Sequence, residues 1–202
     1  MRIGECLEFG WDIFKRHTGG LVAATFCLGV VQSVLDGLIS LAHSFLLTFF
    51  ANMLLSGLTL GGMMNVARIA ARGGSPSLED AFLPYRARQG DYLIVGLAAN
   101  IGAIAFGIGA LITGFICLFA PLLVVDGDDY KQALGRSKDL MFAHVGEGVV
   151  LIAVLGVINL IGFMTVIGAL VTAPVSALAL LKAYEKLSVV KIFPDARPDS
   201  PL

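Results

Sequence analysis

Six long apolar segments alternate with polar segments along the chain, and the apolar segments fall into three pairs. Each pair is roughly 35 to 50 residues long, which is enough for two bilayer crossings of about 17–25 residues each. Because backbone polar groups inside hydrocarbon must hydrogen-bond internally, we expect these segments to be helices. The pattern predicts an all-α, polytopic transmembrane bundle of six helices arranged as three hairpins. The expected crossings are residues 19–41 and 45–67, 92–106 and 109–125, and 145–162 and 165–181.

A polar segment with a helical apolar stripe precedes each pair. In the first of these segments, Ile3, Leu7, Trp11 and Phe14 share one helical face, and the other two segments repeat this spacing. Amphipathic helices of this kind can lie at the water–lipid boundary on the cytoplasmic side. A connecting helix packed on the bundle would show the same stripe, so for the first segment both placements stay open. The expected interfacial anchors are Trp11, Phe14, Phe82, Tyr85 and Tyr130.

The chain also repeats itself, which indicates three degenerate copies of one unit. Residues 129–144 echo residues 2–17, and Asn100 recurs as Asn159, each followed by a similar apolar run. Each copy is interpreted as an amphipathic helix followed by a transmembrane hairpin. The expected organisation is a single membrane domain at residues 1–187, repeats at about 2–72, 77–128 and 129–187, and a flexible cytoplasmic tail at residues 188–202.

The basic residues predict an orientation. All 14 Lys and Arg residues lie outside the apolar runs, in segments that six crossings would place on one side of the membrane. The positive-inside rule makes that side, and with it both termini, cytoplasmic. The chain is 57% apolar and 14% charged, against about a quarter charged in soluble domains. Its net charge of −1 gives no attraction to nucleic acid, so we expect the bilayer as its partner and no nucleic acid.

No pattern in the chain points to catalysis. Cys6, Cys27 and Cys117 match no zinc or redox spacing, and no phosphate loop or nucleophile elbow is found. The acidic run at 126–129 lacks the rest of an EF-hand and is better explained as a helix N-cap. Residues 77–80 carry a similar N-cap pattern. The sequence therefore predicts no enzyme, no metal and no cofactor.

Asp36 is the one acidic residue remote from the cytoplasmic segments, and it forms a small polar cluster with Gln32, Ser33 and His43. An ionisable group inside lipid would indicate a proton or cation site. If the first crossing ends near Leu35, Asp36 instead lies in the outer turn or at the membrane interface and caps the start of the next helix, an interpretation that the length of the run favours. Asp36 is therefore the first candidate for a transport position.

Asn100 and Asn159 are the other candidate polar or transport positions. Asparagine in hydrocarbon usually bonds across to a neighbouring helix, and the recurrence of the two residues favours this packing role over a transport path. Gly57 and Gly61 stand four residues apart, a spacing that allows two helices to approach closely, within one chain or between two.

Several short motifs carry a resemblance to a known group of proteins. They include Ala120-Pro121-Leu-Leu-Val-Val-Asp-Gly, Arg136-Ser137, Thr172-x-Pro174, Ala183-Tyr184 and Gly10-Trp11-x-x-Phe14-Lys15. With these motifs the chain resembles bacterial six-helix inner-membrane proteins of unknown function. The group includes YciC-like proteins and the membrane domain that precedes some glycerophosphodiester phosphodiesterases. The resemblance implies a multi-pass protein of the bacterial inner membrane, and it carries no catalytic residues.

Two functions remain as hypotheses. The first is a non-enzymatic membrane scaffold or accessory subunit, which forms a homo-oligomer or joins a membrane complex. The second is a small-solute or ion permease, for which Asp36, Asn100 and Asn159 would line the path.

Overall fold

The computed structural model describes residues 2–41, 45–101 and 108–192, and these residues form helices without any strand. Four helices are long and apolar enough to cross a membrane, and they coincide with four of the six expected crossings. The all-helical class of the chain is therefore confirmed, and the four apolar helices indicate a membrane-embedded, multi-pass protein. The four helices are α2 (Thr18–Ser40), α3 (Phe45–Ala71), α10 (Val145–Phe163) and α11 (Val166–Ile192).

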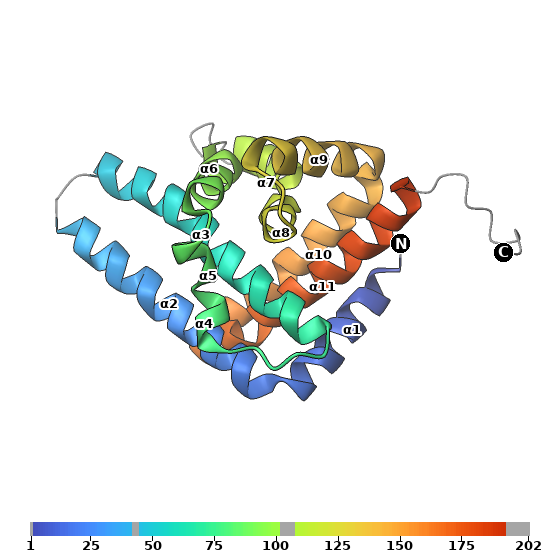
Figure 1. Cartoon of the computed structure of the whole chain (residues 1–202), viewed down its shortest axis with the longest axis horizontal. Coiled ribbons are helices and arrows are strands. Elements are labelled where there is room, and N and C mark those ends of the chain that lie inside the picture. Colours follow the sequence, from blue (N-terminus) through green and yellow to red (C-terminus); the bar gives the residue numbers. More distant parts are fainter. Residues whose placement is uncertain (1, 42–44, 102–107, 193–202) are drawn as a thin grey trace, which may run out of the picture.

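These helices form two hairpins, α2–α3 and α10–α11, which Figure 1 shows in blue to cyan and in orange to red. Half of the apolar span of α11 and 39% of that of α3 are buried, against 11% for α2 and 17% for α10. The helices α3 and α11 also contact each other. They form the middle of the bundle, with α2 and α10 on its flanks.

The expected middle hairpin is built differently. It consists of α6 (Gln89–Asn100), α7 (Ile108–Ile116) and α8 (Ala120–Val125), each shorter than a full crossing. The apolar run at 109–125 is interrupted between α7 and α8. Pro121, in the first turn of α8, explains the break, because it lacks an N–H and its ring clashes with the preceding turn of a helix. The expected turn at 102–107 lies outside the described residues, and an unbroken fourth crossing is not observed.

The first amphipathic segment forms α1 (Ile3–Arg16), which packs along α11. The two backbones come close at Gly10, where a Cβ atom would lie 2.8 Å from the carbonyl oxygen of Val175 and 3.2 Å from the amide of Ala179. Cys6 and Phe14 are buried on the same side of the helix. The placement left open by the sequence is therefore decided in favour of packing on the bundle.

The second amphipathic segment forms two short helices, α4 (Leu78–Ala81) and α5 (Leu83–Arg86), which contact α2 and α3. The expected N-cap is confirmed as a full capping box between Ser77 and Asp80. Pro84 lies in the first turn of α5 and explains why the segment does not continue as one helix.

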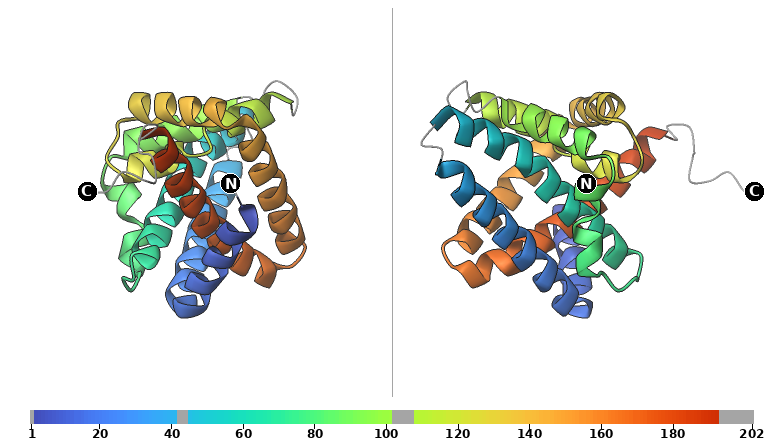
Figure 2. Two further views of the ribbon diagram at one scale, coloured as in Figure 1. Left: turned by 90° about the vertical axis from the view of Figure 1, so that its right-hand side faces the viewer. Right: turned by 60° about the vertical axis from the view of Figure 1, so that its left-hand side comes forward.

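The third amphipathic segment forms α9 (Tyr130–Ala143), which runs along the upper edge of the molecule in Figure 1 and Figure 2 and turns into α10 at His144. Below it lies α8, whose side chains are almost completely buried among α3, α6 and α9. The C-terminal helix α11 continues to Ile192, so residues 188–192 of the expected tail are helical and residues 193–202 lie outside the described part.

Candidate functional site

A chain of hydrogen bonds connects polar side chains of α2, α3 and α5. Gln32 is its centre: its amide nitrogen donates to Asp36 at 3.0 Å and to Asn52 at 3.1 Å, and its oxygen accepts from Thr59 at 2.9 Å. The Thr59 hydroxyl also lies 3.3 Å from the Tyr85 hydroxyl. We call these five residues the Gln32 network. It uses both amide hydrogens of Gln32, so its members fix how α2, α3 and α5 lie against one another.

Asp36 lies inside α2, about one turn before the end of the helix at Ser40, and is half-buried. Of the two placements that the length of the first crossing favours, the outer turn and the membrane interface, the turn is thereby excluded. Gln32 contacts it as the cluster in the sequence suggested, whereas His43 lies outside the described residues.

Asn52, Thr59 and Tyr85 were not expected in this cluster. Asn52 and Thr59 are seven residues apart, which is two helical turns and therefore the same face of α3. That spacing was the available signal. Tyr85 is one of the expected interfacial anchors, and α5 places its hydroxyl within 3.3 Å of the Thr59 hydroxyl.

Asn100 and Asn159 make equivalent contacts in different places. Asn100 donates to Ser56 Oγ of α3 at 2.8 Å and to the carbonyl four residues before it at 2.9 Å. Asn159 donates to Ser176 Oγ of α11 and to the carbonyl of Leu155, four residues before it, both at 2.8 Å. Each amide thus uses both hydrogens for packing within the bundle. Asp36, Asn100 and Asn159 each bond to different partners, so these hydrogen bonds do not join the three side chains into one path.

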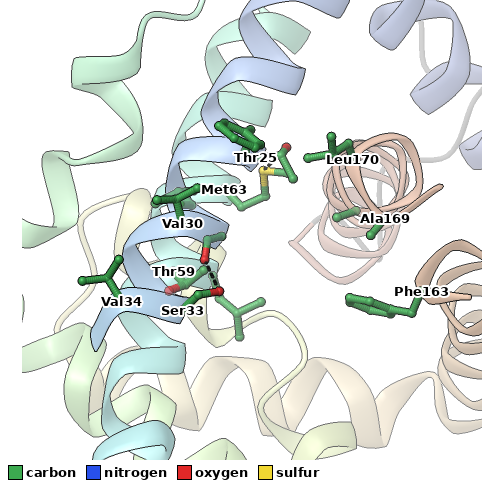
Figure 3. A pocket seen from close by; sticks show the side chains of 14 residues that line it. Thr25, Val30, Ser33, Val34, Thr59, Met63, Phe163, Ala169 and Leu170 are labelled. Carbon is green, nitrogen blue, oxygen red and sulfur yellow. Dashed lines mark hydrogen bonds between the residues drawn. The ribbon is translucent and has the colours of Figure 1, made fainter. Parts of the chain in front are cut away.

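A pocket of about 770 Å³ opens between α2, α3, α11 and the end of α10 (Figure 3). Its walls are mainly apolar. Thr25 and Ser33 line it as well, but their hydroxyls donate to carbonyls of their own helix at 2.7 and 2.8 Å. Thr59 lines the pocket too and belongs to the Gln32 network. The pocket is therefore an apolar groove whose hydroxyls already have acceptors. Its other lining residues are Phe26, Leu28, Gly29, Val30, Val34, Leu60, Met63, Phe163, Ala169, Leu170 and Ala173.

The expected interfacial anchors differ in exposure. Trp11 is 46% exposed and stacks on Phe14, with 5.8 Å between ring centroids, whereas Phe14 is only 5% exposed and belongs to the core. Phe82 and Tyr85 are half-buried, with their ring centroids 5.7 Å apart. Tyr130 is half-buried at the start of α9. Of these five side chains, Trp11 is the most exposed.

Two ion pairs and one hydrogen bond from an arginine to a backbone carbonyl surround the turn that follows α8. Arg68 contacts Asp126 at 2.7 Å, and Arg136 contacts Asp128 at 2.5 Å. Arg88 donates to the backbone carbonyl of Asp128 at 2.7 Å. Asp126 and Asp128, two of the three aspartates in the acidic run at 126–129, therefore neutralise arginines that hold this turn on α3 and α9.

Two further acids complete this region. Asp91 pairs with Arg88 at 3.0 Å and accepts from the backbone amide of Tyr130 at 3.2 Å. Asp129 caps α9 by accepting from the amide of Gln132 at 2.8 Å, as the sequence indicated. No three His, Cys, Asp or Glu side chains gather to hold a metal ion anywhere in the described ranges.

Some of the motifs that carry the family resemblance lie around α8, whereas the motif at residues 10–15 packs on α11. Ser137 bonds to the backbone at the break between α7 and α8, and Arg136 holds the turn after α8. The ring of Tyr184 lies 5.7 Å from that of Phe119. These contacts give the motif residues a role in packing the core. Comparison of the chain with family models, with curated proteins and with solved structures finds no match.

Proposed function

We propose that the protein is a non-enzymatic membrane scaffold or accessory subunit, which assembles with a second copy of itself or with another membrane protein. The observation that carries this proposal is the contrast between the inside and the outside of the bundle. The polar side chains of Gln32, Asn100 and Asn159 are used for bonds between its own helices. The flanking helix α10 is open, with Val149, Ala153, Gly156 and Leu160 exposed along one face.

The face of α10 suits a helix partner. Val149, Ala153, Gly156 and Leu160 follow a spacing of three or four residues, so they form one stripe. A Cβ atom added at Gly156 would meet nothing within 4 Å, so no part of the same chain covers this position. Small residues in an exposed stripe allow another helix to approach closely inside a membrane.

The proposed topology keeps both termini on the cytoplasmic side of a bacterial inner membrane. The helices α6, α7 and α8 form a third, shorter hairpin in this proposal and complete six crossings. With four crossings or six, the two termini share one side, and the positive-inside rule assigns the basic segments to the cytoplasm. The resemblance to bacterial six-helix inner-membrane proteins supports the same placement.

Subunit counting by single-molecule photobleaching in proteoliposomes tests the proposal. We expect wild-type protein to form oligomers that persist on dilution with lipid. Gly156→Leu should make the protein monomeric, whereas Gly37→Leu, which also meets nothing within 4 Å and lies on a flank, should not. A wild type that stays monomeric at every protein-to-lipid ratio and leaves liposome size and shape unchanged would overturn the proposal.

A permease is the second candidate, and the Gln32 network is the observation that favours it. An ionisable side chain among polar groups in a membrane helix is typical of an ion or proton pathway. Flux measured in proteoliposomes with Asp36→Asn and Asn100→Leu distinguishes the candidates. Reduced flux in either variant supports a pathway, and flux unaltered in both removes this one.

A further inference from the structure

The groove between α2, α3 and α11 lies at membrane depth and needs an apolar occupant. Its lining on α2 runs from Thr25 to Val34, the middle of a helix that is apolar and long enough to cross a membrane. An apolar groove at this depth is filled by whatever apolar group is nearest, because neither water nor a void is favourable there. The candidates are the acyl chains of lipids and a helix of a second protein.

The dimensions suit an acyl chain. Thr25 and Val34 are nine residues apart, about 14 Å along a helix. A volume of about 770 Å³ spread over that length gives a flexible apolar chain room to follow the lining. A second copy of the protein chain is the alternative occupant, and the experiment below distinguishes the two.

The outer end of the groove lies beside a carboxylate. Ser33 lines the groove, and Asp36 is three residues further along α2, so the two side chains are neighbours on one helical face. Thr59, another lining residue, is joined to Asp36 through Gln32. Asp36 is 18 residues from the start of α2, about 27 Å along the axis. That distance places it close to the far boundary of a hydrocarbon layer about 30 Å thick.

This arrangement matches an amphiphile with a cationic headgroup. Within the described residues, Gln32 is the donor that contacts the Asp36 carboxylate, and it contacts one of the two oxygens. A carboxylate offers about four acceptor positions, and it binds ammonium donors more strongly than neutral ones. We infer that the groove binds an acyl chain of a phospholipid from the surrounding bilayer, and that the primary ammonium group of its ethanolamine headgroup pairs with Asp36.

Native mass spectrometry of the protein in mild detergent tests this inference. The protein is offered equal amounts of phosphatidylethanolamine, phosphatidylcholine and phosphatidylglycerol with identical acyl chains. We expect monomeric protein to retain one phosphatidylethanolamine in preference to the other two lipids. Because this readout is taken on monomers, its outcome is distinct from that of the assembly experiment. Separate variants then test the contact with the lipid headgroup and the contact with the acyl chain.

Asp36→Asn should weaken phosphatidylethanolamine retention about tenfold, the usual size of one charge-assisted bond. Gly29→Leu should weaken retention of all three lipids, because the new side chain projects from a lining position and meets no other part of the chain within 4 Å. Gly19→Leu, equally free of contacts on the same helix, is the control.

Thermal melting of each variant establishes that it is folded. Equal retention of the three lipids by the wild type would contradict the headgroup assignment. Lipid retention by Gly29→Leu equal to that of the wild type would overturn the inference. Dimer formation on removal of the lipid would overturn it too, because a second copy of the protein would then occupy the groove.

Discussion

The side chain of Ser137 in α9 makes two hydrogen bonds to the backbone between α7 and α8, one of them with Phe119. Its hydroxyl accepts from the Phe119 amide at 3.1 Å and donates to the Ile116 carbonyl at 2.7 Å. Ile116 is the last residue of α7 and Phe119 directly precedes α8, so neither backbone group has the helical partner that it would have in an uninterrupted helix. Ser137 is completely buried. Its hydroxyl therefore satisfies two buried backbone groups that the interruption of the helix would otherwise leave unpaired.

Replacing Ser137 with Ala should therefore destabilise the protein by about 1–3 kcal/mol, because it leaves a buried donor and a buried acceptor unpaired. Thermal unfolding in detergent measures the effect as a lower midpoint. Ser40→Ala is the matched control, since Ser40 is exposed and its hydroxyl donates to the Gly37 carbonyl of its own helix. An equal midpoint for the two variants would contradict this role of Ser137.

The α3–α6 crossing should not tolerate a side chain at Gly57. A Cβ atom there would lie 1.9 Å from the carbonyl oxygen of Tyr92 and 2.8 Å from the amide of Gly96. Because backbone atoms cannot move aside, Gly57→Ala should cost about 1–3 kcal/mol or more, again measured by thermal unfolding. Gly114→Ala, which lies inside α7 and meets nothing within 4 Å, should not lower the midpoint and can raise it slightly, because Ala favours a helix over Gly. Equal stability of Gly57→Ala and wild type would show that the two helices do not cross here.

Labelling of Cys6 should report whether α1 is docked on α11. Burial raises the pKa of the Cys6 thiol, so in the docked state it should react slowly with maleimide at neutral pH. Gly10→Leu should displace α1 and make Cys6 reactive, whereas Gly4→Leu, with no neighbour within 4 Å, should not. Both variants are made in a background that lacks Cys27 and Cys117. Fast labelling of Cys6 with Gly10 intact would mean that α1 is not held on α11.

The pairing of Glu5 with Lys186 should survive at neutral pH and fail in acid. The Lys186 ammonium lowers the pKa of the Glu5 carboxyl below its ordinary value of 4.5. A lowered pKa means that the stabilisation is complete above about pH 4.5 and is lost as the pH falls through the lower value. The emission of Trp11, the single tryptophan of the chain, should stay constant from neutral pH down to that point and then change.

Glu5→Gln is the control for that titration, because it removes the carboxylate and should abolish the part of the change due to the pair. Lys15 likewise lowers the pKa of the Asp12 carboxyl, but that pair lies within α1 and does not join α1 to α11, so Glu5→Gln should leave its contribution unchanged. A wild-type transition centred above pH 5, or one that Glu5→Gln leaves intact, would exclude the ion pair as its cause.

The four long helices could be predicted from the sequence because their apolar runs are continuous and long. The interruption of the middle hairpin could not be predicted, because Pro121 and Pro174 lie in similar apolar runs and have different effects on them. Pro121 lies in the first turn of α8 after a break, whereas Pro174 lies within α11 without ending it. Pro174 is completely buried, so packing from neighbouring helices can hold a helix together that proline alone would interrupt.

The placement of α1 could not be predicted either. An apolar stripe that faces another helix has the same spacing as one that faces lipid, so Phe14 gave no sign of which it would meet. The Gln32 network depends on how α2 and α3 are rotated about their axes. The sequence showed that Asn52 and Thr59 share a face, but not that this face turns toward Gln32.

The contact between α1 and α11 joins the first helix of the chain to the last, through Glu5 and Lys186, which are 181 residues apart. Figure 1 shows the two helices side by side. A ribosome produces α1 before α11, and the partner surface of α1 does not exist until α11 has been made. During synthesis, Cys6 and Phe14 therefore lack their final neighbours, and the bundle can close only after α11 has left the ribosome.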